Sequence, residues 1–297
     1  MNWFAGFALE HRTVDGLRLR LRHGGRADAP ALLMLHGFPQ THAMWHRVAQ
    51  RLAPHFCIVL PDLRGYGESA KPPGGPDHAN YSKRAMAADM VSLMHELGHE
   101  RFALVGHDRG ARVAHRLALD HPEPVRKLAL IDIAPTLDMY EATDRRLATL
   151  YYHWFHLIQP APLPERMIGG DALAYLHAKL GGWGGGDALG HLEPQGLADY
   201  ERCFCHPDTI HAACEDYRAA AGIDLEHDRA SRAAGDKIRC DTLVMWGERG
   251  VIERLFDPVA LWQAQCERPV QACRLPGGHF LAEELPEATA DALLAFL

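Results

Sequence analysis

The stretch of sequence that decides the fold is Gly106-His107-Asp108-Arg109-Gly110. It has the glycine, nucleophile, glycine frame of a sharp turn between a strand and a helix, with an aspartate where an esterase has serine. Residues 102–105 before it form an apolar run typical of a buried strand, and residues 111–119 after it predict a helix. A carboxylate held at such a turn can attack carbon and form an ester. This stretch therefore predicts hydrolysis at a saturated or strained carbon and argues against ordinary ester cleavage.

Short apolar runs bounded by turn residues recur along the chain, at residues 31–35, 57–60, 102–105, 128–131, 242–246 and 271–275. Their alternation with helix-like segments predicts an α/β fold with a mostly parallel sheet covered on both faces. The alternation is interrupted between the fourth and fifth runs by a helical, loop-rich segment. We therefore expect a core domain made of residues 1–135 and 236–297, with a helical cap domain, residues 136–235, inserted after its sixth strand.

Length and composition limit the class of protein. A chain of 297 residues can bury one large core with an inserted cap. The formal net charge of -7 argues against a nucleic acid or an anionic membrane as partner. No apolar run approaches the roughly 18 residues of a membrane span, and the N-terminus lacks an export signal. The 7 cysteines have no framework spacing, so we expect a reduced, cytoplasmic protein.

Two further turns supply partners for Asp108. Phe38 lies in His36-Gly37-Phe38-Pro39 after the first apolar run, and its backbone N–H is expected to form an oxyanion hole with that of Arg109. His279 follows the last apolar run in a Gly-Gly turn, and the order nucleophile, acid, histidine is that of the α/β-hydrolase fold. A neutral imidazole can activate water near neutral pH. We therefore expect His279 to be the base.

The acid that supports His279 has two candidates. Glu248 follows the strand-like run at residues 242–246, at a position where many proteins of this fold carry the acid. Asp132 ends the run at 128–131 instead, and a lone aspartate in an apolar strand is costly to bury unless it is paired. An imidazolium would provide that pairing. We favour Asp132 and keep Glu248 as the alternative.

Arg109 and Arg112 follow the expected nucleophile and lie three residues apart on the predicted helix, so they can share one face. They could be a surface salt-bridge pair. Two guanidinium groups this close to Asp108 would also bind a substrate carboxylate, each through its planar fork of donors, and would keep Asp108 ionised. We favour a carboxylate clamp.

Three other motifs are interpreted as structural. His95-Glu96-Leu97-Gly98-His99 matches a zinc-protease pattern, but Gly98 is a typical helix stop and would separate the two histidines. Cys203-Phe204-Cys205-His206 lacks a second ligand pair for a zinc site. The glycine cluster at residues 181–186 lacks the Lys-Ser/Thr signature of a phosphate-binding loop, so we expect a cap loop there. We expect the chemistry to need neither a metal nor an organic cofactor.

With these residues assembled, the chain resembles the fluoroacetate (haloacetate) dehalogenases of the α/β-hydrolase superfamily over almost its whole length. The motifs that carry the resemblance are residues 36–42, 62–67, 106–112, 132–136, 152–154, 214–218 and 278–280. The resemblance implies an α/β-hydrolase fold with helices on both faces of the sheet and an inserted helical cap. It also implies hydrolysis of haloacetates to glycolate and halide through an ester on Asp108, without a cofactor.

The family also implies roles for individual residues. Asp108 would be the nucleophile, Asp132 the acid and His279 the base, with Arg109 and Arg112 as the carboxylate clamp. His153, Trp154 and Tyr217 would form the halide pocket, with Trp183 as a further pocket residue. Relatives suggest a homodimer acting on a small haloacid. The chain departs from the family pattern at residues 137–150 and at Glu248-Arg249, which bears on substrate size and halide preference.

An epoxide hydrolase is the rival interpretation, because it would use the same aspartate nucleophile. Such an enzyme needs phenolic donors in the cap, and Tyr152 with Tyr217 could serve. Paired arginines beside the nucleophile would have no role with a neutral epoxide. A non-catalytic receptor on the same scaffold is a third interpretation, and the intact Asp108, Asp132 and His279 set argues against it.

Overall fold

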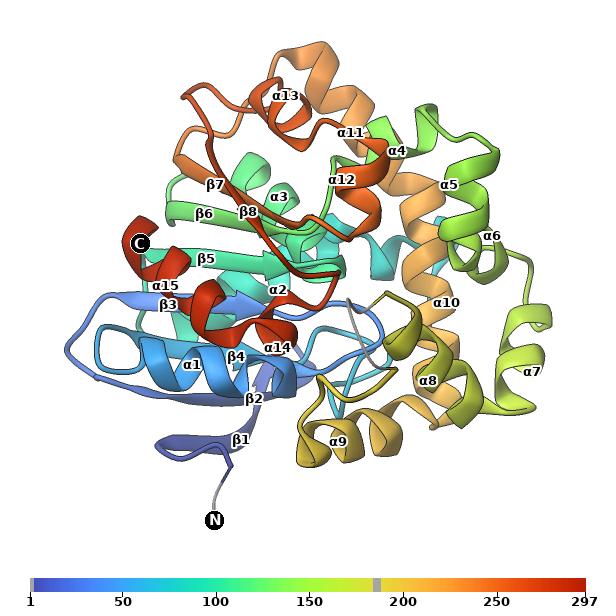
Figure 1. Ribbon diagram of the computed structural model, residues 1–297, viewed down its shortest axis with the longest axis horizontal. Helices are drawn as coiled ribbons and strands as arrows, with labels where there is room; N and C mark the ends of the chain where they lie inside the picture. The colour runs from blue at the N-terminus through green and yellow to red at the C-terminus, as the bar shows by residue number, and fades with distance from the viewer. Residues whose placement is uncertain (1–2, 184–187) are drawn as a thin grey trace.

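The computed structural model describes residues 3–183 and 188–297 (Figure 1). In this part of the chain a single sheet has the strand order β1-β2-β4-β3-β5-β6-β7-β8. Its strands are β1 (Phe7–Val14), β2 (Leu17–Gly25), β3 (Ala31–Leu35), β4 (Cys57–Pro61), β5 (Phe102–His107), β6 (Val125–Ile131), β7 (Asp241–Gly247) and β8 (Gln271–Leu275). β2 pairs antiparallel with β1 and β4, and the other neighbours pair in parallel. The predicted mostly parallel α/β sheet is confirmed, and the six predicted runs form β3 to β8.

The first two strands, which an insertion after the sixth strand implies, were not located in the sequence. They form an antiparallel hairpin in which Val14 pairs with Leu17 across a two-residue turn. Asp15 and Gly16 both have positive φ angles, 49° and 80°. An Asp-Gly pair between strands is a strong hairpin signal, because this turn requires a left-handed backbone at both central residues. That signal was available in the sequence.

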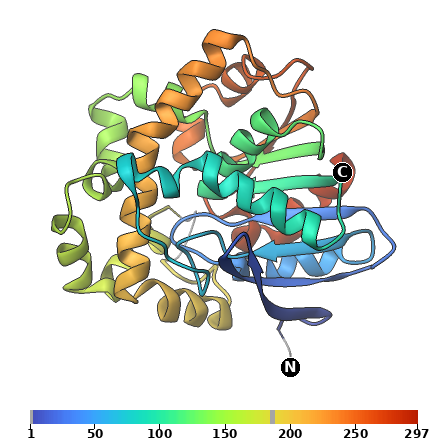
Figure 2. The same cartoon turned by 180° about the vertical axis from the view of Figure 1, so that it is seen from behind.

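Helices cover both faces of the sheet. Helices α1 (His46–Leu52), α14 (Leu281–Glu284) and α15 (Pro286–Phe296) lie in front of it in Figure 1. The view from behind shows α2 (Lys83–Glu96) and α3 (Arg109–Asp120) on the opposite face (Figure 2). Four shorter helices complete this part of the fold. The 3₁₀ helices η1 (His42–Trp45) and η2 (Pro76–Tyr81) precede α1 and α2, and α12 (Val251–Leu255) and α13 (Pro258–Gln263) precede β8.

The helices between β6 and β7 gather at the end of the sheet toward which the parallel strands run (Figure 1). They are α4 (Thr136–Glu141), α5 (Arg145–Leu150), α6 (Tyr152–Leu157), α7 (Leu163–Gly169), α8 (Ala172–Trp183), α9 (Pro194–Phe204), α10 (Pro207–Ala221) and α11 (Ile223–Ala234). They correspond in position to the cap expected at residues 136–235, and the division into two domains stays a prediction. The prediction of a loop at residues 181–186 is wrong for residues 181–183, which belong to α8. Residues 184–186 lie outside the described part of the chain.

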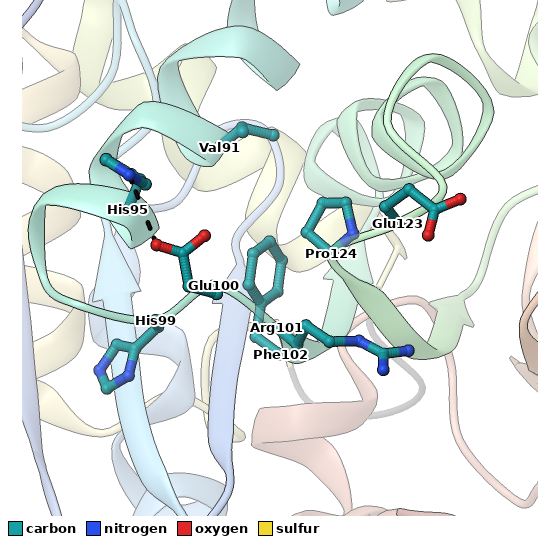
Figure 3. Close-up of a pocket in the computed structure, with 8 residues that line it drawn as sticks. All are labelled: Val91, His95, His99, Glu100, Arg101, Phe102, Glu123 and Pro124. Carbon is teal, nitrogen blue, oxygen red and sulfur yellow. Dashed lines mark ion pairs between the residues drawn. The ribbon is translucent and has the colours of Figure 1, made fainter.

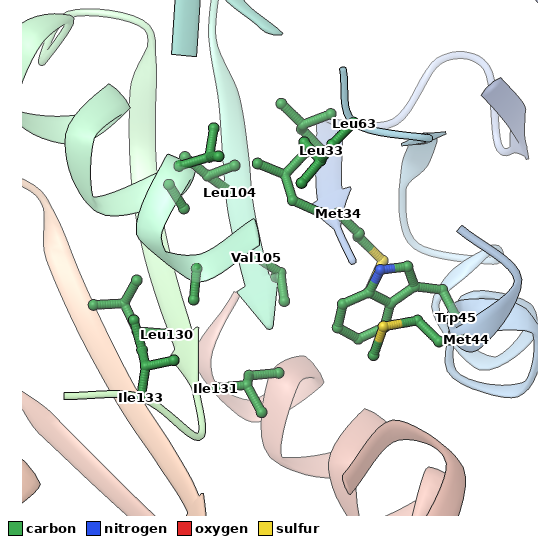
Figure 4. Packing of buried hydrophobic residues seen from close by; sticks show 14 of the residues in the cluster. Leu33, Met34, Met44, Trp45, Leu63, Leu104, Val105, Leu130, Ile131 and Ile133 are labelled. Atoms are coloured by element: carbon green, nitrogen blue, oxygen red, sulfur yellow. The ribbon is translucent and has the colours of Figure 1, made fainter. Parts of the chain in front are cut away.

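The core is built on the central strands, whose two faces are both covered. Every residue of β3 and of β5 is buried. Strands covered on both faces read as continuous apolar runs, which explains why these segments could be located from the sequence. Figure 4 shows Met34 of β3 packed with Met44 and Trp45 from η1, next to the side chains of β5 and β6.

The His-Glu-x-x-His motif lies at the end of a helix, as predicted from Gly98. Helix α2 ends at Glu96, and Gly98 follows with a φ angle of 82°. His95 is paired with Glu100 at 3.4 Å (Figure 3), whereas His99 Nε2 lies 3.7 Å from Cys57 Sγ. The two histidines therefore do not share a helix face.

The described residues contain neither a metal-binding cluster nor a membrane-spanning helix. Among residues 3–183 and 188–297, no group of three or more histidine, cysteine or acidic side chains is placed to hold a metal ion. None of the helices in these ranges has the length and apolar character needed to cross a bilayer.

Candidate active site

Asp108 lies at the turn between β5 and α3. Its φ angle of 47° is unusual for a residue other than glycine. Glycines make this turn possible: a Cβ on Gly106 would lie 2.5 Å from Ala111 Cα, and one on Gly110 would lie 2.4 Å from the His36 carbonyl oxygen. Strand, turn and helix therefore pack too closely for any other residue at these two positions, and they present the Asp108 side chain at the sheet end that faces the cap.

The two carboxylate oxygens of Asp108 have different surroundings. Oδ1 accepts a hydrogen bond of 2.8 Å from the backbone N–H of Phe38. The N–H of Arg109 is at the first position of α3, where a helix offers no internal acceptor. Oδ2 lies 3.9 Å from His279 Nε2. One oxygen is thus held by the turn at Phe38, and the other faces His279.

His279 is paired with Asp132. His279 Nδ1 lies 2.6 Å from Asp132 Oδ2, and Asp132 Oδ1 accepts a hydrogen bond of 3.1 Å from the N–H of Gly247. Both side chains are buried. Glu248 is instead half-exposed and paired with Arg274 at 3.2 Å. The geometry brings Asp132, and not Glu248, to the histidine.

Electrostatics favour opposite charges on Asp108 and His279. Burial alone would raise the pKa of Asp108, but His279, His107, Arg112 and Arg109 together hold it below its ordinary value. Burial opposes a charge on His279, and the hydrogen bond and charge of Asp132, with the charge of Asp108, raise the pKa of His279 nevertheless. The carboxylate is therefore ionised at neutral pH.

Arg109 is held by an acidic residue of the cap that the sequence analysis did not single out. Asp216 on α10 accepts hydrogen bonds from Arg109 Nε at 2.9 Å and Nη2 at 2.7 Å. The same carboxylate is hydrogen-bonded to Lys83 and to the Tyr66 hydroxyl. All four side chains are buried. This arrangement fixes the guanidinium and leaves its Nη1 without a partner.

Arg112 is fixed in a comparable way. Its Nη1 donates to the Ala134 carbonyl oxygen at 3.2 Å and to Thr136 Oγ1 at 2.8 Å, while Nε has no partner. The expectation that each arginine offers a whole planar fork is therefore wrong. Each fork is largely occupied by the protein, and among the described residues the nitrogens left without a partner are Arg109 Nη1, which carries two N–H groups, and Arg112 Nε, which carries one.

The cap contributes a cluster of aromatic rings above Asp108. The ring of His153 lies 4.4 Å from that of Trp183, 5.5 Å from that of Tyr217 and 5.9 Å from that of Phe38, measured between centroids. Tyr217 and Trp154 lie 6.4 Å apart. Each of the last two packs on an arginine, with Arg109 Cζ 4.2 Å from the Tyr217 ring and Arg112 Cζ 4.7 Å from the Trp154 ring. The structure thus brings all the residues expected in the pocket into one cluster with Phe38, Arg109 and Arg112.

In the described part of the chain, four buried polar groups of this cluster have no hydrogen-bond partner: Arg109 Nη1, Arg112 Nε, His153 Nδ1 and Tyr217 Oη. Buried polar groups are normally hydrogen-bonded, and each unsatisfied one costs about 1–3 kcal/mol. Such groups concentrated around one carboxylate indicate a binding site for a small polar ligand. Two are on arginines, so the ligand should be anionic.

The sequence analysis missed four neighbours of the site: Asp216, Lys83, Tyr151 and Lys179. Asp216 directly precedes Tyr217 in a motif that was noted, and only its partners in three dimensions reveal its role. The expectation that Tyr152 could pair with Tyr217 is not met. Tyr152 is 47% exposed whereas Tyr217 is fully buried, and Tyr151 is the tyrosine that contacts His153.

Fold and site together define an α/β hydrolase with a carboxylate at the nucleophile position. The family model for the alpha/beta hydrolase fold matches residues 30–164. The chain is 46% identical to a fluoroacetate dehalogenase from Burkholderia sp over 99% of its own length and 95% of that protein. It therefore belongs to the fluoroacetate dehalogenase family of hydrolases.

Two other similarities are informative. A soluble epoxide hydrolase from Corynebacterium sp. (strain C12) is 30% identical over 95% of this chain and 94% of its own. A crystal structure described as an α/β hydrolase, from Nostoc sp PCC 7120, superposes with a TM-score of 0.95 at 52% identity, covering 99% of this chain and 98% of that one. The chain is thus similar to proteins named for two different reactions, fluoroacetate dehalogenation and epoxide hydrolysis.

Proposed function

We propose that the protein is a hydrolytic dehalogenase that converts haloacetates, such as fluoroacetate and chloroacetate, to glycolate and halide. The observation that carries this proposal is the set of unpartnered donors on Arg109, Arg112, His153 and Tyr217 around an ionised Asp108. A haloacetate presents one carboxylate for the arginines and one halogen for the remaining donors. The resemblance of the whole chain to a fluoroacetate dehalogenase supports the same assignment.

Binding comes first in the proposed mechanism. Arg109 Nη1 and Arg112 Nε each donate one hydrogen bond to the substrate carboxylate. Asp216 and Thr136 already hold the two guanidinium groups, so the arginine side chains lose little further conformational entropy when the substrate binds. The α-carbon then lies beside Asp108, with its halogen toward the cap.

Displacement is the first chemical step. Asp108 Oδ2 attacks the α-carbon, a carbon–oxygen bond forms, and the carbon–halogen bond breaks with its electron pair leaving on the halide. His153, Trp154 and Tyr217 surround the halide and stabilise its developing charge. Burial and the charge of Lys179 lower the pKa of His153, so this imidazole is neutral and carries a single N–H.

Hydrolysis of the ester is the second step. His279 takes a proton from water, and the resulting hydroxide attacks the Asp108 carboxyl carbon. The N–H groups of Phe38 and Arg109 stabilise the oxyanion, and Asp132 supports the imidazolium. Glycolate then leaves with the proton, and one solvent oxygen remains in Asp108.

Charge changes during the first step prepare the second. The negative charge of Asp108 is one of the causes that raise the pKa of His279. Ester formation removes this charge, so the pKa of His279 falls at the stage when it must accept a proton. A neutral base is therefore available in the intermediate.

The rival activity, epoxide hydrolysis, has less support. The phenol pair expected for it, Tyr152 with Tyr217, is not formed, because Tyr152 is 47% exposed; the two buried tyrosines that contact the His153 ring are Tyr151 and Tyr217. A neutral epoxide would also leave the buried Arg109 Nη1 and Arg112 Nε unused. Two assays of the same protein separate the activities: a dehalogenase releases halide from chloroacetate, and an epoxide hydrolase forms a diol from styrene oxide.

The test of the proposal is to trap the ester. His279→Asn should retain displacement and lose hydrolysis, so intact-mass measurement after addition of chloroacetate should show one carboxymethyl adduct, located on Asp108. Asp108→Asn is the matched control and should show none. An unmodified His279→Asn protein, or a wild type that releases no halide, would overturn the proposal.

We also propose a cytoplasmic homodimer. All seven cysteines, Cys57, Cys203, Cys205, Cys214, Cys240, Cys266 and Cys273, are free, which suits a reducing compartment. The dimer rests on the resemblance to the family, and sedimentation equilibrium tests it.

A further inference from the structure

Lys179 on α8 is a buried lysine without an acidic partner. Its residue is 3% exposed, and within the described chain no carboxylate pairs with it. A buried ammonium normally requires a counter-charge. Burial accordingly lowers the pKa of Lys179 to about 8.

Aromatic rings surround the ammonium group instead. Lys179 Nζ lies 3.7 Å from the centroid of Tyr152, 5.0 Å from Trp183 and 5.4 Å from Tyr175. The negative faces of aromatic rings attract a cation and offset part of the cost of burial. They cannot accept its three hydrogen bonds, so Lys179 keeps donors for a ligand.

A cavity of about 420 Å³ connects this lysine with the active site. Its lining includes Lys179, Trp183 and His279, together with Arg249, which precedes α12, and Arg254 in the last turn of α12. No aspartate or glutamate lines it in the described chain. Arg254 has no carboxylate partner there, and Arg249 approaches Glu284 only to 3.9 Å. The cavity is therefore positively charged, on a protein whose net charge is -7.

Trp183 links the cavity to the halide pocket. Its ring lies 4.4 Å from the ring of His153 and 5.7 Å from that of His279. The charge of Lys179 reaches His153, where it is the largest cause of a lowered pKa after burial. An anion in the cavity would therefore lie one aromatic ring away from the reacting groups.

We propose that this cavity is a second site for a small monoanion, in which Lys179, aided by Arg249 and Arg254, binds the carboxylate of a haloacetate before it reaches Arg109 and Arg112, or the halide after it leaves Asp108. The inference rests on the proposed function, since such a site is useful to an enzyme whose substrate and products are anions. A cationic cavity before an active site raises the local concentration of an anionic substrate and its association rate.

The first experiment is kinetic and compares Lys179→Met with Lys179→Arg. At low ionic strength the methionine variant should lose about tenfold in kcat/KM for chloroacetate while kcat stays within about twofold, and added salt should reduce the difference. The arginine variant should behave like the wild type. Equal losses in kcat and kcat/KM, or no rescue by arginine, would overturn the proposal.

The second experiment measures binding without turnover. In Arg112→Met, which weakens the inner clamp, acetate and bromide are titrated separately while tryptophan fluorescence is followed, because Trp183 lies against Lys179. A saturable change with either anion that disappears in Arg112→Met/Lys179→Met supports the site and identifies its anion class. No saturable change, or one that survives loss of Lys179, overturns it.

Circular dichroism checks folding, and the exposed Arg254→Gln offers a milder variant that should weaken binding.

The two experiments also separate this inference from the proposed function. The titration needs no catalysis, so its failure leaves a dehalogenase without an outer site. If the wild type releases no halide but the titration saturates, the cavity binds anions and the proposed function is wrong.

Discussion

Asp108 is a strained residue whose side chain is held on one side only. Its φ angle of 47° costs free energy for an aspartate, on the order of 1–3 kcal/mol. The backbone N–H of Phe38 donates a hydrogen bond to Oδ1, whereas Oδ2 faces His279. The Asp108 carboxylate is therefore buried, ionised and fixed in orientation, which are the properties that the proposed nucleophile needs.

Asp216 should control substrate binding through Arg109. Asp216→Asn removes the charge that holds the guanidinium, and breaking one partner of a buried ion pair costs about 3–5 kcal/mol. We expect a large rise in KM for chloroacetate with a smaller change in kcat. Steady-state kinetics and urea unfolding measure the two effects.

The matched control is Asp216→Asn/Lys83→Met, which removes one charge of each sign. It should recover part of the lost stability while KM stays high, since Arg109 still lacks its partner. Recovery of KM in the double variant would show that Asp216 acts only on stability.

The pH dependence of ester hydrolysis should report on His279. The base must be neutral, and in the ester, where Asp108 carries no charge, the hydrogen bond and charge of Asp132 are what raise the pKa of His279 against burial. The rate should therefore increase as pH rises through this pKa. In Asp132→Asn the pKa falls, so the increase should occur at lower pH, with a maximal rate reduced on the order of 10³–10⁴-fold. Single-turnover profiles measure both, and superimposable profiles would contradict the assignment.

At the scale of elements, the turn between β5 and α3 depends on close packing against β3. A Cβ on Gly110 would lie 2.4 Å from the His36 carbonyl oxygen, which is backbone and cannot move freely. The short turn and the parallel pairing of β3 with β5 leave no room for relaxation.

Gly110→Ala should therefore destabilise the protein by about 1–3 kcal/mol and reduce halide release, because relief of the clash moves Asp108. Gly169→Ala on α7 is the control, since nothing lies within 4 Å of its added Cβ. Urea unfolding of the two variants is the measurement. Equal stabilities would show that the turn is less constrained than its geometry indicates.

The parallel strands and the turns after them could be predicted because the signals are local. A strand covered on both faces is a continuous apolar run, and the glycines around Asp108 follow from one tight turn. The β1–β2 hairpin carried an equally local signal at Asp15 and Gly16, which was overlooked. Partners such as Asp216 for Arg109 are 107 residues apart in sequence and depend on how α10 packs, so no local pattern contains them.

At the scale of the whole molecule, polar networks join the cap helices to the sheet. Arg20 on β2 pairs with Asp199 on α9 at 3.0 Å, and Thr41 donates to the same carboxylate. Nearby, Glu283 on α14 is buried with Gln40 and with Tyr200 on α9. The position of the cap over Asp108 therefore depends on buried hydrogen bonds as well as on apolar packing.

Glu283 should make stability depend on pH. Burial raises the pKa of Glu283 to about 8, from an ordinary value near 4.5, so the folded protein binds a proton that the unfolded chain releases. Stability contributed by this group is lost as pH rises from about 4.5 to about 8. Glu283→Gln cannot ionise, so its stability should change less across this window.

Urea unfolding at both ends of the window checks this expectation. Near pH 5 the variant and the wild type should differ little, and near pH 8 the variant should be more stable by on the order of 2 kcal/mol. A difference that is the same at both pH values would show that Glu283 is ionised in the folded protein.

The central claim is that the carboxylate of Asp108 itself forms the bond to carbon. Multiple turnovers of chloroacetate in heavy-oxygen-labelled water, followed by mass spectrometry of the peptide that contains Asp108, test this most directly. Because water attacks the carboxyl carbon of the ester, the heavy oxygen should accumulate in the Asp108 side chain. An unlabelled Asp108 beside labelled glycolate would mean that water attacks the substrate directly, and would contradict the mechanism.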